Sequence, residues 1–250
     1  MTSKTMPIVQ PTAVFFDLDE TLIQHSQEIS VLAAGALRKI DPERAHATLD
    51  FNVALKGAAE SLWPHIHEYT GRGEQVLGGV LSNALAAIGS EPSLGPKMLK
   101  IITSDVAAST QLTPHAHETL QELKSMGIAV GIITNGFTFL QMHKVRAHGL
   151  MTQVDFVITS EDAGTHKPDR RIFDMALQKA GVHAATSWYV GDNYDKDIRG
   201  CTLAGMVGVL FDPDGGFEAC NKVTHPYTPH YIARNLRDIL SMVNGTIAPK

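Results

Sequence analysis

The feature that most constrains the fold is a repeated order of two kinds of segment, a short apolar run and then a stretch with helical periodicity. The apolar runs are rich in β-branched and aromatic residues, which favours buried strands. They span residues 13–16, 128–134, 154–160, 188–191, 206–211 and 230–233. The stretches with one apolar helical face span residues 114–126, 172–180, 198–204 and 235–243. Strands that alternate with helices predict βαβ units around a parallel sheet.

One long stretch interrupts this alternation. Residues 26–109 contain no convincing strand, and helices are predicted over 29–40, 42–59 and 74–88, with glycine and proline between them. We therefore predict an α/β core made of residues 1–25 and 110–250. A helical cap domain, residues 26–109, is inserted after its first strand.

Charge and composition exclude several classes of partner. The chain has 21 basic and 26 acidic residues, a formal charge of −5, so it has no general attraction to nucleic acid or to an anionic membrane. No apolar stretch approaches the roughly 20 residues that cross a bilayer, and the start lacks the apolar segment of a signal peptide. Two cysteines are too few for a disulfide framework. These features predict a soluble cytoplasmic protein with no nucleic-acid or membrane partner. A monomer or a homodimer is expected, and the sequence does not choose between them.

Two pairs of carboxylates follow two different predicted strands. Asp17 and Asp19 come after the first strand, with Thr21 close behind, and Asp192 and Asp197 come after the strand at 188–191. Parallel strands end at the same edge of a sheet, which is where open α/β sheets bind ligands. Carboxylate oxygens gathered there are the donors that Mg²⁺ prefers. The sequence therefore predicts a Mg²⁺ site.

Residues suited to a phosphate follow two further strands. Thr134, Asn135 and Gly136 offer a hydroxyl and a turn with free backbone N–H groups, where a phosphate can approach the backbone. Lys167 lies just before a predicted helix. Taken alone, Lys167 would be an ordinary surface lysine.

In this order, the four groups resemble the motifs of the haloacid dehalogenase superfamily. The first motif stands here as FFDLDET, the second as IITNG, the third as HKPD and the fourth as GDNYDKD. Any one of these motifs is weak, but four in register are specific. The residues around the third and fourth motifs resemble those of the branch that contains nucleotide 5′-phosphatases and N-acylneuraminate 9-phosphatase. The resemblance implies a Rossmann-like parallel sheet core with an inserted all-α cap domain.

The resemblance also implies roles. Asp17 would be the nucleophile that takes up the phosphoryl group, and Asp19 the general acid and base. Thr134 and Lys167 would hold the phosphoryl oxygens, with Asn135 and Gly136 at the same site. Asp17, the backbone carbonyl of Asp19, and Asp192 would bind Mg²⁺, and Thr21 and Asp197 would support the site. The implied activity is hydrolysis of a small phosphorylated metabolite, and a general acid at Asp19 is expected to have a raised pKa.

Other functions on this scaffold stay open. The dehalogenases of the superfamily lack the second aspartate, so Asp19 favours a phosphatase. Phosphomutases share all four motifs, and phosphonatases use a cap lysine for which no motif stands out here. A catalytically silent binding or regulatory protein is the alternative of another class, but every expected catalytic position carries a competent residue.

Two further groups of residues are weaker candidates. Five in the insertion could face the leaving group, although packing or solvation explains them as well: Trp63, His65, His67, Tyr69 and Arg72. His143, Lys144 and Arg146 stand on a predicted helix after Gly136 and could flank the mouth of the site, although a solvated helix face is the expected interpretation.

Overall fold

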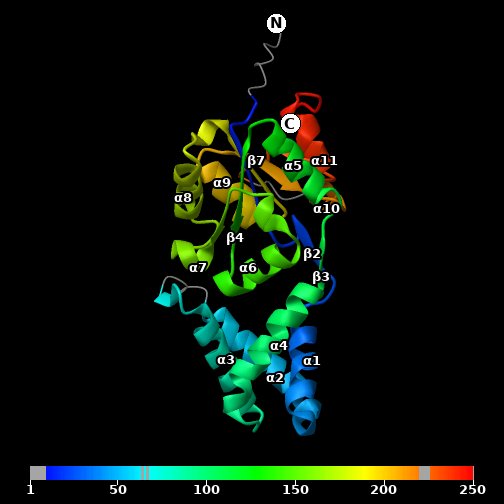
Figure 1. The fold of residues 1–250 in the computed structure, drawn as a ribbon, viewed down its shortest axis with the longest axis vertical. Helices are drawn as coiled ribbons and strands as arrows, with labels where there is room; N and C mark the ends of the chain where they lie inside the picture. Colours follow the sequence, from blue (N-terminus) through cyan, green and yellow to red (C-terminus); the bar gives the residue numbers. More distant parts are fainter. Residues whose placement is uncertain (1–9, 63–64, 66–67, 220–225, 250) are drawn as a thin grey trace, which may run out of the picture.

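The computed structural model describes residues 10–219 and 226–249, except 63, 64, 66 and 67. Its centre is a parallel sheet of six strands in the order β5-β4-β1-β6-β7-β8 (Figure 1). The strands are β1 (Ala13–Phe16), β4 (Ala129–Thr134), β5 (Phe156–Thr159), β6 (Ser187–Gly191), β7 (Val207–Phe211) and β8 (Tyr231–Ala233). Strand β1 lies between β4 and β6, so its carboxyl end is at the middle of the sheet edge.

Helices cover both faces of the sheet, because alternate residues of each strand point to opposite faces. Val14 and Phe16 of β1 pack with α5 (Ala116–Ser125), α6 (Thr138–Ala147) and α11 (Arg237–Val243). Phe15 belongs to the apolar cluster on the other face, with α8 (Arg170–Ala180) and α9 (Gly200–Leu203). The remaining helical segments of this part are α7 (Ser160–Ala163), a π-helical segment (Tyr194–Arg199), α10 (Gly216–Ala219), and short 3₁₀ turns at Leu150–Thr152 and Ala184–Thr186.

The chain leaves and re-enters this core through two short antiparallel strands, β2 (Ile23–His25) and β3 (Thr110–Leu112). Between them lies the helical insertion, which Figure 1 shows beyond the end of the sheet. Its helices share an apolar cluster of their own. They are α1 (Ile29–Ile40), α2 (Thr48–Glu60), α3 (Gly73–Ala87) and α4 (Gly95–Ala108), with 3₁₀ segments at Pro42–Ala47 and Pro92–Leu94.

The predicted fold class, a parallel α/β core with a helical insertion, is confirmed. The strands β2 and β3 were not predicted, because three residues carry too little pattern to stand out. Helix α4 was not predicted either, since Gly95 and Pro96 look like loop residues. Pro96 instead occupies the first turn of α4, where proline is well tolerated. Among the described helices, none has the length and apolar character needed to span a membrane.

Candidate active site

Three strand ends bring three of the predicted site residues to one edge of the sheet. Asp17 follows β1, and its N–H still donates to the carbonyl of Val190 at 2.8 Å, so its backbone is fixed by the sheet. Thr134 is the last residue of β4, and Asp192 follows β6. Because β1 lies between β4 and β6, the three side chains start from adjacent strands. The predicted convergence at the carboxyl edge is therefore observed.

Lys167 lies at the centre of this group and is buried. Its Nζ is 2.8 Å from Oδ1 of Asp17 and 2.7 Å from Oδ1 of Asp197. The same ammonium donates to the hydroxyl of Tyr189 at 2.9 Å, and that hydroxyl donates to the carbonyl of Ile133 at 2.9 Å. A buried ammonium is stable only when it is paired in this way. One cation therefore joins the ends of β1 and β6.

Asn135 fixes the backbone of Lys167. Its Oδ1 accepts from the N–H of Lys167 at 2.8 Å, and its Nδ2 donates to the Lys167 carbonyl at 3.0 Å. The N–H of Gly136 donates to Oγ of Ser160 at 2.9 Å. The prediction of free backbone N–H groups in this turn is therefore wrong for Gly136, because a hydroxyl from the neighbouring strand end has taken that donor.

Three carboxylates can hold a metal ion. One oxygen each of Asp17, Asp192 and Asp197 lies within 4.8 Å of the others. Such a set of hard oxygen donors suits Mg²⁺. Gly191 makes room for it, since a Cβ there would lie 2.4 Å from Oδ2 of Asp197. Thr21 is buried beside the set, with its hydroxyl 3.4 Å from Oδ1 of Asp192.

The ionisation of these groups reflects their crowding. Burial raises the pKa of Asp17 to about 7; Lys167 opposes this shift and Asp197 adds to it. Burial, with Asp197 nearby, also raises the pKa of Asp192 to about 6. Burial by itself would lower the pKa of Lys167, but Asp17 and Asp197 raise it to about 12. More negative groups than positive ones meet here, so an added cation would be stabilised.

Asp19 has different neighbours, and two of them come from helix α6. Oδ1 of Asp19 is 2.5 Å from Nζ of Lys144, and Oδ2 accepts from Nε2 of Gln141 at 2.9 Å. Nε2 of His25 lies 3.4 Å from Oδ1. Burial would raise the pKa of Asp19, but Lys144 and Gln141 outweigh burial and lower it. The expected raised pKa is therefore wrong for this structure, because the sequence did not show the ammonium of Lys144 beside the carboxyl.

Sequence and structure comparisons agree with this geometry. The family described as haloacid dehalogenase-like hydrolase matches residues 11–205. The chain belongs to this family. It is 31% identical over 200 residues to the glyceraldehyde 3-phosphate phosphatase of Methanocaldococcus jannaschii, covering 78% of this chain and 82% of that one. It is 30% identical over 222 residues to the phosphoserine phosphatase of Thermus thermophilus, covering 80% and 88%.

Solved structures are similar over nearly the whole chain. The 2-haloacid dehalogenase of Pseudomonas syringae pv. Tomato superposes with a TM-score of 0.70 at 25% identity, covering 95% of this chain and all of that one. The resemblance inferred from the four motifs is therefore confirmed, and the chain is a haloacid dehalogenase-like hydrolase.

Two residues of this hydrolase that contact Asp19 were not identified from the sequence. Nothing in the local sequence singles out Gln141, and Lys144 is expected on a solvated helix face, yet both side chains are buried. His143 and Arg146 on the same helix are exposed, as expected. The available signal was spacing, because residues three apart on a helix share a face.

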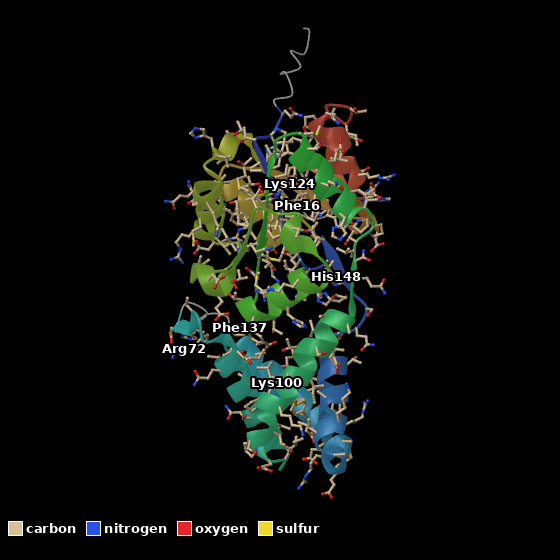
Figure 2. All side chains as sticks on the ribbon, viewed as in Figure 1. Phe16, Arg72, Lys100, Lys124, Phe137 and His148 are labelled. Atoms are coloured by element: carbon tan, nitrogen blue, oxygen red, sulfur yellow. The ribbon has the colours of Figure 1, made fainter. Side chains whose placement is uncertain are left out.

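A third unforeseen residue joins the core to the insertion. The buried carboxylate of Glu161 accepts from the N–H of Gly73 at 2.8 Å and from the N–H of Thr138 at 2.7 Å. Figure 2 shows Phe137, next to Thr138, where the insertion meets the core. The ring of Phe137 packs with Leu62 and Val80 of the insertion.

The weaker candidates in the insertion have three different outcomes. Trp63 and His67 lie outside the described residues. His65 and Arg72 are exposed, and Tyr69 packs against the cluster that contains Phe137.

Proposed function

We propose that the chain is a magnesium-dependent phosphatase that hydrolyses a small-molecule phosphate monoester through an aspartyl-phosphate on Asp17. The observation that carries this proposal is the buried contact of Lys167 with Asp17, which is also one of three carboxylates that can hold a divalent cation. The phosphatase names of the two curated relatives support the same reaction class.

In the first step, a carboxylate oxygen of Asp17 forms a bond to phosphorus while the bond from phosphorus to the leaving oxygen breaks. Asp19 supplies the proton that the leaving oxygen takes up. The phosphoryl oxygens need fixed positive charge and donors, which Lys167 and the hydroxyl of Thr134 provide. An anionic substrate beside Asp19 favours the protonated form of that carboxyl.

In the second step, water forms a bond to phosphorus and gives a proton to the carboxylate of Asp19, while the bond to the Asp17 oxygen breaks. The aspartyl-phosphate intermediate thus divides one difficult displacement into two easier ones. Asp17, Asp192 and the backbone carbonyl of Asp19 would hold Mg²⁺, and Asp197 would support both Lys167 and the site. When bound, Mg²⁺ supplies positive charge that offsets the negative charge of the phosphoryl group.

The helical insertion, residues 26–109, would act as the cap domain over this site, and residues 1–25 and 110–250 as the catalytic core. The position of the insertion beyond the carboxyl ends of the strands supports this division (Figure 1). Such a cap excludes water during the first step and selects the leaving group.

The test is hydrolysis of 4-nitrophenyl phosphate with and without Mg²⁺. We expect release of nitrophenolate that depends on Mg²⁺ and is abolished by Asp17→Asn. The matched control is Asp195→Asn, because Asp195 is an exposed aspartate in the segment that follows the neighbouring strand β6. Full activity of Asp17→Asn would contradict the mechanism.

The same preparation separates the alternatives. A dehalogenase would release halide from a 2-haloacid without needing Mg²⁺, and a phosphomutase would need a bisphosphate activator and would keep the phosphate on its product. A silent binding protein would turn over none of these substrates. A panel of three-carbon phosphates, sugar phosphates and nucleotides would then identify the leaving group, starting from glyceraldehyde 3-phosphate and phosphoserine.

A further inference from the structure

Helix α6 holds both oxygens of one carboxylate. Nζ of Lys144 lies 2.5 Å from Oδ1 of Asp19, and Nε2 of Gln141 lies 2.9 Å from Oδ2. Both partners contribute N–H donors to a carboxylate that only accepts. With its two oxygens bound separately, the carboxyl plane of Asp19 cannot rotate freely.

Gln141 makes a second contact that links two parts of the site. Its Nε2 lies 2.6 Å from Oγ1 of Thr134, the hydroxyl at the end of β4. One amide group therefore fixes Asp19 relative to the residue proposed to hold the phosphoryl oxygens. Gln141 is 3% exposed and Lys144 is 5% exposed, so water does not compete freely for these contacts.

The burial of Lys144 is itself informative. Lysine is almost never buried unless it is paired, and α6 has exposed positions such as His143 and Arg146 where a lysine would cost nothing. The core at this point includes Val145, which is fully buried. A cation kept here needs the carboxylate of Asp19 as its partner.

We propose that Gln141 and Lys144 are positioning residues that hold Asp19 as the base for breakdown of the aspartyl-phosphate. This inference rests on the proposed phosphatase function. In that step a water oxygen bonds to phosphorus, its proton moves to the Asp19 carboxylate, and the bond from phosphorus to the Asp17 oxygen breaks. A carboxylate fixed beside Thr134 is held next to the phosphorus that water must reach.

The helix that carries the pair is anchored on both sides. Val145 packs in the core cluster under the sheet. Phe139, in the first turn of α6, packs against the apolar cluster of the insertion. Gln141 and Lys144 therefore stand on a helix whose position is set by the core and the insertion together.

The experiment uses 4-nitrophenyl phosphate, whose leaving group needs little help from an acid. Lys144→Met and Gln141→Leu should each lower kcat by about tenfold, a part of what a general base contributes. Because breakdown then limits the rate, KM should fall with kcat and leave kcat/KM within about twofold of the wild-type value. Rapid mixing should show a burst of nitrophenolate that approaches one equivalent per active site.

The matched control is Arg146→Met, the same kind of change at an exposed position of α6, which should leave all these values unchanged. Lys144→Arg keeps the cation and should retain a higher kcat than Lys144→Met. If either apolar variant fails to fold, Gln141→Asn carries the test, because it withdraws the amide by one methylene but keeps a polar side chain.

Three results would decide the matter. An unchanged kcat in the folded variants overturns the inference. A parallel fall of kcat and kcat/KM without a burst also overturns it, because that pattern indicates general damage to the site. If the wild-type protein itself shows no Mg²⁺-dependent turnover, the proposed function fails, which is a different outcome.

Discussion

Nζ of Lys167 lies 2.8 Å from Oδ1 of Asp17, and the same nitrogen lies 2.7 Å from Oδ1 of Asp197. All three side chains are largely or completely buried. A single ammonium therefore separates two carboxylates that would otherwise repel each other in a medium of low dielectric. The contact is expected to affect both stability and activity, because one of the two carboxylates is the proposed nucleophile.

Replacing Lys167 should destabilise the fold as well as the reaction. Lys167→Met leaves Asp17 and Asp197 without their cation, and breaking a buried pair in this way costs about 3–5 kcal/mol. We expect a loss of this size in the free energy of unfolding measured with urea in the absence of Mg²⁺. Lys39→Met is the control, since the pair of Lys39 with Asp105 is at the surface and contributes about 0–1 kcal/mol. Equal losses in the two variants would contradict the role assigned to Lys167.

Asp192 should control binding of the cation. Asp192→Asn removes one of the charged oxygens of the carboxylate set, so the Mg²⁺ concentration for half-maximal activity should rise by about tenfold or more. Isothermal titration calorimetry should show the same weakening of Mg²⁺ binding without substrate. Asp195→Asn changes the net charge equally at an exposed position and should leave both values unchanged. If both variants bind Mg²⁺ alike, Asp192 is not a ligand.

Glu161 should act as a latch between core and insertion. In Glu161→Gln only one side-chain oxygen remains to accept from the N–H groups of Gly73 and Thr138, so one of these buried donors loses its partner at a cost of about 1–3 kcal/mol. We expect faster cleavage by trypsin between core and insertion and a higher KM. The control Glu74→Gln changes an exposed residue in the first turn of α3. Unaltered proteolysis of Glu161→Gln would show that the latch is dispensable.

Asp169 should contribute stability that depends on pH. It caps α8 by accepting from the N–H of Arg171 at 2.9 Å. The side chain of Arg171, together with its backbone N–H, lowers the pKa of Asp169 to about 2, although burial opposes this shift. A folded-state pKa below the usual value of about 3.9 means that this stabilisation is present above that value and is lost as the pH falls toward 2.

The measurement for Asp169 is urea unfolding at pH 7 and at pH 3. Asp169→Ala should lose about 1 kcal/mol at pH 7, as for a lost helix cap, and less at pH 3. Asp169→Asn keeps a capping oxygen without the charge, so its stability should lack this pH dependence. A loss for Asp169→Ala that is the same at both pH values would contradict the assignment.

The sequence predicted the core elements well because their patterns are local. The run at 13–16 coincides with β1, and helix 29–40 coincides with α1. The helix predicted at 198–204 begins earlier, as a π-helical turn at Tyr194–Arg199, and within this turn Asp197 contacts Lys167. That contact joins residues far apart in the chain, so no local pattern reports it.

Part of the site could be predicted for a similar reason. Asp17 and Asp192 each follow a strand and Thr134 ends one, so their meeting depends only on strand order. The contacts of Gln141 and Lys144 with Asp19 depend on how α6 is rotated against the sheet, and the rotation follows from packing in the assembled core. A lysine on an amphipathic helix looks the same in sequence whether it meets solvent or a carboxylate.

The central place of β1 has a consequence for biosynthesis. β1 pairs with β4 and β6, and both are translated after the whole of residues 26–109. The helices of the insertion contact each other over short sequence distances, so they can fold during synthesis. At that stage β4, the first partner strand of β1, has not yet been made. The apolar segment from Ala13 to Phe16 therefore has no partner strand until β4 has been translated, and it lacks its second partner until β6 follows. In that interval it is an unpaired apolar strand of the kind that chaperones bind.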